Sequence, residues 1–217
     1  MTEQRRWEII EEVIADVGRP ELGFDTRSRR DFVASVGGNG QSYWSSWYHF
    51  AICYKDAFDV LWDAAYADAS PRKNDCFPLL FVCRQSIELW LKAAISAVEQ
   101  AKPPVHHKLG GLWSRLGAAW SEHTDHPAWN EPNDRSPDSA YAESVMDLIQ
   151  ILGAHDEKGD RFRYPTAKGG NLYPETDVDL DGLYRAHELI TGFCDGVLTQ
   201  VEVERDFDEA YSLDNMY

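Results

Sequence analysis

Three charged residues, Arg84, Glu88 and Lys92, recur at four-residue spacing inside an almost continuously apolar stretch, Cys76 to Ala101. At about 100° per residue, a helix over this stretch places Arg84 in the middle of an apolar stripe and Glu88 within about 40° of it. Lys92 falls at the edge of the same stripe. Because an unpaired buried charge is costly, we expect these side chains to have partners.

Two interpretations of these charges are open. In the first, Arg84 and Glu88 form a structural ion pair at i, i+4 spacing that fixes the register of the helix. In the second, the pair forms the floor of a polar pocket at one end of a helical bundle, where binding sites of bundles are built from interior polar groups. Glu88 alone satisfies only part of the arginine fork, which favours a second acceptor nearby.

Two other segments carry groups that such a pocket would use. His107 lies just after a Pro-Pro break, near the start of a predicted helix, and an imidazole can transfer protons near neutral pH. The segment 160–165 alternates charged and aromatic residues within a long loop. Each segment also has a simpler interpretation. His107 could form a hydrogen bond to the backbone at the start of the helix, and Arg163 and Tyr164 could hold the loop against the bundle by stacking and salt bridges.

The candidate site residues follow from these segments. The candidate catalytic residues are Arg84, Glu88, His107 and Arg163, and the candidate substrate-binding residues are Lys92, Asp160 and Tyr164.

The same residues carry a resemblance to a known family. The run 81–93, with His107-Lys108-Leu109 and the segment 160–165, resembles bacterial proteins of the HEPN superfamily (higher eukaryote and prokaryote nucleotide-binding). The resemblance extends over about Ser42 to Arg205 and implies an α-helical, often dimeric bundle. Many members are metal-independent endoribonucleases of toxin–antitoxin and antiviral systems, while others are non-catalytic binding modules.

The chain departs from the catalytic pattern of that family. Catalytic members carry an arginine followed, about four to six residues later, by a histidine on the same helix. Here Arg84 is followed by Glu88, and the pair Arg115 and His123 is too widely spaced. If the chain cleaves RNA, we expect His107 to deprotonate the 2′-hydroxyl while arginines 84 and 163 stabilise the charge that develops on phosphate.

Net charge limits the possible partners. The chain has 217 residues, with 37 Asp and Glu against 21 Lys and Arg, and a formal net charge of −16. Because affinity for phosphates is built from Lys and Arg, we expect no broad DNA binding and only a local site for RNA or a nucleotide. The first functional hypothesis is a HEPN-like protein of a bacterial defence or toxin–antitoxin type system that acts on or binds RNA or a nucleotide. The net charge favours the alternative, a non-catalytic adaptor, antitoxin or sensor subunit that binds a basic protein partner.

Other signals are weak or missing in the sequence. No glycine-rich dinucleotide or phosphate loop occurs, and His123 and His126 lie without a helical HExxH context, so we expect neither a cofactor nor a metal. No long uncharged apolar run is present, and we expect a cytoplasmic chain without a membrane span. The four cysteines lie in apolar runs and are expected to be reduced, buried thiols.

Apolar periodicity predicts an all-α fold, a four-helix up-and-down bundle with an extra N-terminal helix and a long ordered loop before the last helix. The four long helices are expected at 42–69, 76–101, 139–154 and 178–205, with shorter ones at 3–17 and 107–122. Residues 1–40 are expected to form the N-terminal helix and linker, 41–205 the HEPN-like bundle and 206–217 an acidic tail. The all-round apolar helix 76–101 is central or lies at a subunit interface, and we expect a homodimer.

Overall fold

The computed structural model describes residues 4, 43–67, 73–124, 137–175 and 177–214. The chain divides into two units, Met1–Gly38 and Asn39–Tyr217. Apart from Gln4, the expected N-terminal helix and linker lie outside the described residues. The elements below all belong to the second unit.

Five α-helices make up the described part of this unit, which contains no β-strand. They are α2 (Tyr43–Tyr66), α3 (Lys73–Glu99), α4 (Leu109–Thr124), α6 (Pro137–His155) and α7 (Leu180–Asp214). The all-α prediction is confirmed. The largest difference lies at the end of α7, which continues through nine residues of the expected acidic tail, because no glycine or proline follows Arg205 in that stretch.

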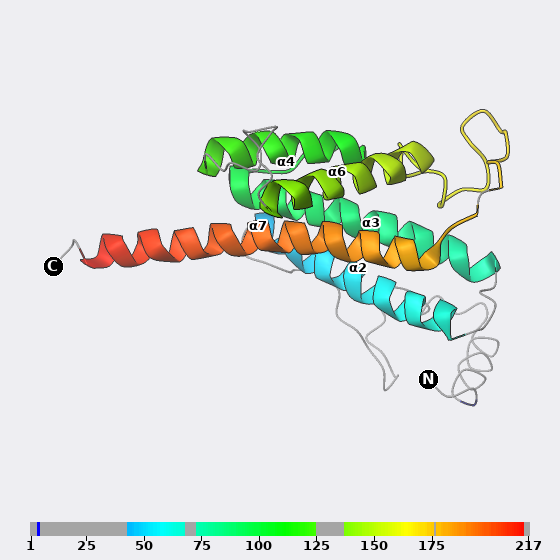
Figure 1. The fold of residues 1–217 in the computed structure, drawn as a ribbon, viewed down its shortest axis with the longest axis horizontal. Helices are drawn as coiled ribbons and strands as arrows, with labels where there is room; N and C mark the ends of the chain where they lie inside the picture. The colour runs from blue at the N-terminus through cyan, green and yellow to red at the C-terminus, as the bar shows by residue number, and fades with distance from the viewer. Residues whose placement is uncertain (1–3, 5–42, 68–72, 125–136, 176, 215–217) are drawn as a thin grey trace, which may run out of the picture. The chain divides into compact units, whose positions relative to one another are not determined.

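Helix α3 lies at the centre of the packing. It contacts α4 and α7, α4 contacts α6, and α6 contacts α7, so these four helices close a ring. Helix α2 packs along α3 outside that ring (Figure 1). The bundle prediction is confirmed, but its membership differs: the short helix α4 belongs to the ring, whereas the long helix α2 is the additional one. Helix α4 holds this place because it buries the apolar residues Leu109, Leu112, Trp113, Leu116 and Trp120.

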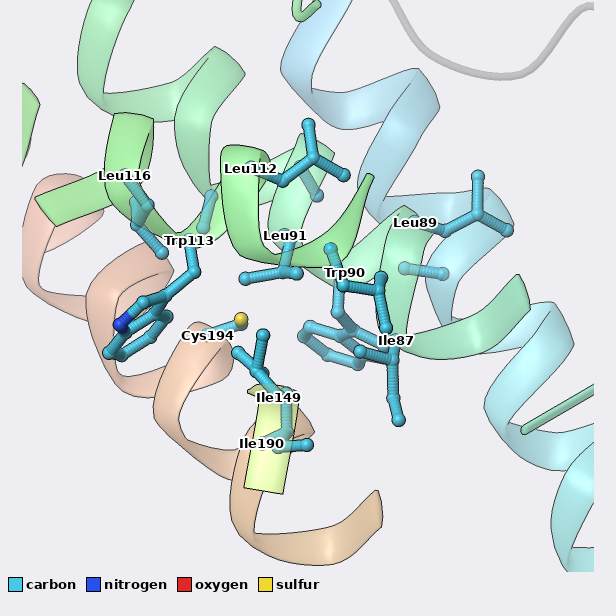
Figure 2. Packing of buried hydrophobic residues seen from close by; sticks show 14 of the residues in the cluster. Ile87, Leu89, Trp90, Leu91, Leu112, Trp113, Leu116, Ile149, Ile190 and Cys194 are labelled. Carbon is cyan, nitrogen blue, oxygen red and sulfur yellow. The ribbon is translucent and has the colours of Figure 1, made fainter. Parts of the chain in front are cut away.

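The hydrophobic core lies where the four helices of the ring meet (Figure 2). Leu91 of α3, Ile149 of α6 and Ile190 of α7 are almost wholly excluded from solvent. Every residue of α3 from Ser86 to Val98 is buried, as its all-round apolar character indicates. This burial brings Glu88 and Lys92 into the interior of the protein, where Arg84 also lies.

The loop between α6 and α7 is held by its own polar groups. Asp156 Oδ1 accepts the backbone N–H groups of Asp160 and Arg161 at 2.9 and 3.1 Å. The Arg161 guanidinium donates to the carbonyls of His155 and Pro174 at 3.2 and 3.0 Å, which ties the two ends of the loop together. These bonds explain how a long segment with a single β-bridge keeps a defined path.

The expectation of four buried thiols is only partly met. Cys83 and Cys194 are buried, and burial raises the pKa of both thiols well above the ordinary value. Cys76 is half-buried, whereas Cys53 is exposed on α2. All four are free thiols. Over the described ranges, no helix has the length and apolar character needed to cross a membrane.

Candidate functional site

Arg84, Glu88 and Lys92 of α3 form one buried cluster around the carboxylate of Glu88. Its Oε2 accepts from Arg84 Nη1 at 3.0 Å, and its Oε1 accepts from Lys92 Nζ at 2.8 Å. All three side chains are at least nine-tenths buried. The i, i+4 spacing on an apolar face of α3 causes both the burial and the pairing.

His107 joins the cluster from the connection between α3 and α4. Its Nδ1 lies 2.8 Å from Glu88 Oε1, and 53% of its side chain is exposed, against 3% for Glu88. An ionised carboxylate can only accept a hydrogen bond, so Nδ1 carries the proton in this contact. In the neutral ring, Nε2 is then the nitrogen that can accept a proton. A buried carboxylate thus orients an imidazole that solvent can reach.

Arg84 connects α3 to two chain segments that are distant in sequence. Its Nε donates to the Asp156 carbonyl at 3.4 Å, and its Nη2 donates to the His107 carbonyl. Together with the bond to Glu88, all three nitrogens of the guanidinium donate to protein acceptors. The arginine therefore holds the His107 connection and the end of α6 against the same point of α3.

The charges around Glu88 keep it ionised. Burial by itself raises the pKa of a carboxyl group, but Lys92, His107 and Arg84 act in the opposite direction through hydrogen bonds and charge. Their combined effect is larger than that of burial, and the pKa of Glu88 lies below its ordinary value. The cluster therefore contains one carboxylate that is shared among a guanidinium, an ammonium and an imidazole.

The three candidate residues of the long loop lie outside this cluster. Asp160 and Tyr164 line an open surface hollow of about 510 Å³, together with Lys168 and three neighbouring residues. The backbone of Asp160 is bonded to Asp156, whose carbonyl accepts from Arg84. The exposed Arg163 lies with its Cζ 5.2 Å from the centre of the Phe81 ring on α3.

The structure thus brings four of the seven candidate residues into direct contact: Arg84, Glu88, Lys92 and His107. Asp160 and Tyr164 belong to a neighbouring hollow, and Arg163 packs on α3 one turn before Arg84. The alternative arginine and histidine of α4 are each paired elsewhere, Arg115 with Glu99 and His123 with Glu204.

Two residues of the site were missed by the sequence analysis. Asp156 supplies both the carbonyl that accepts from Arg84 and the carboxylate that orders the loop. Gly159 has a positive φ of 74°, and a Cβ at this position would lie 3.5 Å from Arg84 Nη2. Glycine adopts this backbone conformation without strain, and this conformation, not the space beside the guanidinium, is the reason for a glycine here. An Asp followed three residues later by Gly, directly after a predicted helix, is the only sequence signal for this turn.

A second buried polar pair also went unnoticed. His187 of α7 is fully buried, and its Nε2 lies 2.9 Å from Ser86 Oγ of α3. Burial, reinforced by the charge of Lys55, lowers the pKa of His187 to about 3, although Asp59 opposes the shift. No solvent reaches this pair, so it links α3 and α7 and is not a surface site.

This low pKa predicts a pH-dependent stability. In the unfolded chain a histidine takes up a proton near pH 6.5, whereas folded His187 stays neutral down to about pH 3. The His187 contribution is therefore complete above pH 6.5 and falls by about 1.4 kcal/mol per pH unit below it. Urea unfolding at pH 7, 6 and 5 measures this slope. His187→Phe should flatten it, and identical slopes in the two proteins would show that another group is responsible.

The described ranges hold no group of three or more His, Cys, Asp or Glu residues that could bind a metal ion. Comparisons with known protein families, with curated proteins and with solved structures find no match for this chain. The resemblance to HEPN proteins therefore stays a prediction.

Proposed function

We propose that this protein is a HEPN-like ribonuclease of a bacterial defence or toxin–antitoxin type system, in which His107 transfers the proton. The observation that supports this proposal is the contact between the buried Glu88 carboxylate and the exposed imidazole. A carboxylate that fixes one ring nitrogen and leaves the other at the surface is the arrangement used by catalytic histidines in general acid–base chemistry.

In the proposed reaction, His107 Nε2 accepts the proton of a ribose 2′-hydroxyl. The 2′-oxygen attacks the adjacent phosphorus, a new P–O bond forms, and the bond to the 5′-oxygen of the next nucleotide breaks. Solvent supplies the proton that this leaving oxygen needs. Glu88 stabilises the imidazolium formed in the first step, as the carboxylate of a catalytic triad does.

The surrounding residues have distinct roles in this proposal. Because Arg84 and Lys92 are buried and bonded to protein groups, they position Glu88 and the His107 connection. The phosphate is contacted by exposed cations, Arg163 and Lys108, the second of which forms an exposed ion pair with Glu157 at 2.8 Å. The hollow beside Tyr164 accepts a nucleotide base, for which an exposed aromatic ring is a stacking surface.

Substitution of His107 tests the proposal. We expect His107→Ala to lower the rate of cleavage of a mixed-sequence single-stranded RNA by about 10² to 10⁴. The melting temperature should change little, because the imidazole is half exposed. The matched control is His106→Ala, which removes the neighbouring exposed histidine and should cleave at the wild-type rate. Wild-type protein that leaves RNA intact, or a His107→Ala protein as active as wild type, contradicts the proposal.

The alternative proposal is a non-catalytic adaptor, antitoxin or sensor subunit that binds a basic protein. Two observations favour it: the net charge of −16, and a cluster whose two buried cations are already bonded to protein groups, both to Glu88 and Arg84 also to two backbone carbonyls. Absence of RNA cleavage together with tight, salt-sensitive binding of a basic partner would support it. The expected homodimer stays a prediction, which sedimentation analysis of the full chain tests.

A further inference from the structure

Helix α2 carries a second apolar stripe that the bundle does not use. Its inner side packs on the core through Ala51, Phe58 and Ala65. Another side, turned by about 120° from the first, carries five exposed apolar or small residues with alternating spacings of three and four: Phe50, Cys53, Ala57, Val60 and Ala64. Phe50 is 47% exposed and Val60 is 69% exposed. We call these five residues the outer stripe of α2.

The spacing of the outer stripe is that of a coiled-coil seam. In heptad notation, Phe50, Ala57 and Ala64 occupy a positions, and Cys53 and Val60 occupy d positions. The stripe runs for about 21 Å along the helix, which is long enough for two full heptads. The small residues between Phe50 and Val60 leave holes into which the side chains of another helix can pack.

The charges beside the outer stripe indicate the kind of helix that fits. Asp56 and Asp63 are exposed and occupy successive g positions along one edge, about 10 Å apart along the helix axis. The other edge carries the half-buried Tyr54 and Leu61. A partner with Lys or Arg opposite the two aspartates gains attraction, whereas an acidic partner is repelled. A second copy of this chain would bring the same two aspartates and a net charge of −16, which disfavours self-association through this stripe.

We propose that the outer stripe of α2 docks a basic amphipathic helix of a partner protein, with its apolar heptad positions on the stripe and its basic residues beside Asp56 and Asp63. This inference is independent of the ribonuclease proposal, because the stripe and the His107 site share no residue. An apolar stripe with a charged edge is a recurrent mode of helix recognition.

The test uses the full chain and a fluorescein-labelled peptide of about three heptads, with leucine at a and d and lysine at e and g. A peptide of the same composition in scrambled order is the control ligand. Fluorescence anisotropy measures affinity, and the rate of alkylation of the exposed Cys53 reports whether the peptide covers the stripe. We expect the heptad peptide to bind at least about tenfold more tightly than the scrambled one. It should also protect Cys53, with no change at Cys76.

Matched variants separate the stripe from general charge attraction. Phe50→Ser with Val60→Ser, and separately Asp56→Lys with Asp63→Lys, should each weaken binding by about tenfold or more. The pair Glu143→Lys and Asp147→Lys makes the same charge change on two exposed residues of α6 and should leave binding within about twofold.

Three results would overturn the proposal. They are equal loss of affinity in the α6 control, no preference for the heptad peptide over the scrambled one, and a homodimer that the Phe50→Ser with Val60→Ser protein no longer forms. The last result would identify a second copy of the chain as the occupant of the stripe.

Discussion

The Glu88→Gln protein is expected to lose about 3 to 5 kcal/mol of its free energy of unfolding. Glutamine has nearly the size of glutamate, so the cost arises from charge and not from a cavity. Without the carboxylate, the guanidinium of Arg84 and the ammonium of Lys92 remain buried with no counter-ion in contact among the residues that the structure describes. Urea unfolding at pH 7 measures the loss.

Two controls identify the origin of this loss. Glu157→Gln removes the exposed carboxylate that pairs with Lys108, and its stability should stay close to that of the wild type, because water screens exposed pairs. The triple protein Arg84→Met, Glu88→Leu, Lys92→Met replaces the whole cluster by apolar side chains and should recover much of the stability lost in Glu88→Gln. If the single substitution costs less than about 1 kcal/mol, the cations have found other partners and Glu88 does not hold the cluster together.

Glu88 has two roles that its own substitution cannot separate. It pairs with two buried cations, and it contacts the imidazole of His107. Reduced RNA cleavage in Glu88→Gln would follow equally from unfolding and from a disoriented imidazole. His107→Ala separates the two effects, because it removes the exposed member of the pair and leaves both buried cations bonded to Glu88.

The contacts that depend on local geometry were predictable from the sequence. Residues four apart on a helix are neighbours, so the pairing of Arg84 with Glu88 follows once the apolar stretch is recognised as a helix. The contact of His107 with the cluster rests on weaker grounds. The guanidinium of Arg84 has more donors than Glu88 can satisfy, and the polar segment that contains His107 follows directly after the helix. The structure supplies that acceptor from the backbone carbonyl of His107.

The contacts that depend on tertiary packing were not predictable. The carbonyl of Asp156 accepts from Arg84, but every residue has a carbonyl and the sequence does not mark this one. Ser86 and His187 lie 101 residues apart and meet only because α3 packs against α7. Apolar periodicity indicates which face of α4 is buried, but it does not specify which helix that face will contact.

The contacts of α3 with α2, α4 and α7 predict a second large effect, for Leu91→Ala. Leu91 is fully buried among residues of α4, α6 and α7 (Figure 2). Loss of its side chain leaves a cavity that four packed helices cannot readily close, and we expect a destabilisation of about 2 to 5 kcal/mol. The control Leu189→Ala removes a leucine of α7 that is 39% exposed, where water can occupy the vacated space, and should cost much less.

Urea unfolding of both proteins, with intact far-ultraviolet circular dichroism, measures the two costs. Similar values for Leu91→Ala and Leu189→Ala would contradict the central position of α3. A large cost for Leu91→Ala alone would support this central position. Tight packing of α3 would also explain how the chain tolerates a buried charged cluster on the same helix. Helices α2, α4 and α7 pack against α3 and hold Arg84 and Lys92 close enough to Glu88 for the attraction to offset the cost of removing these charges from water.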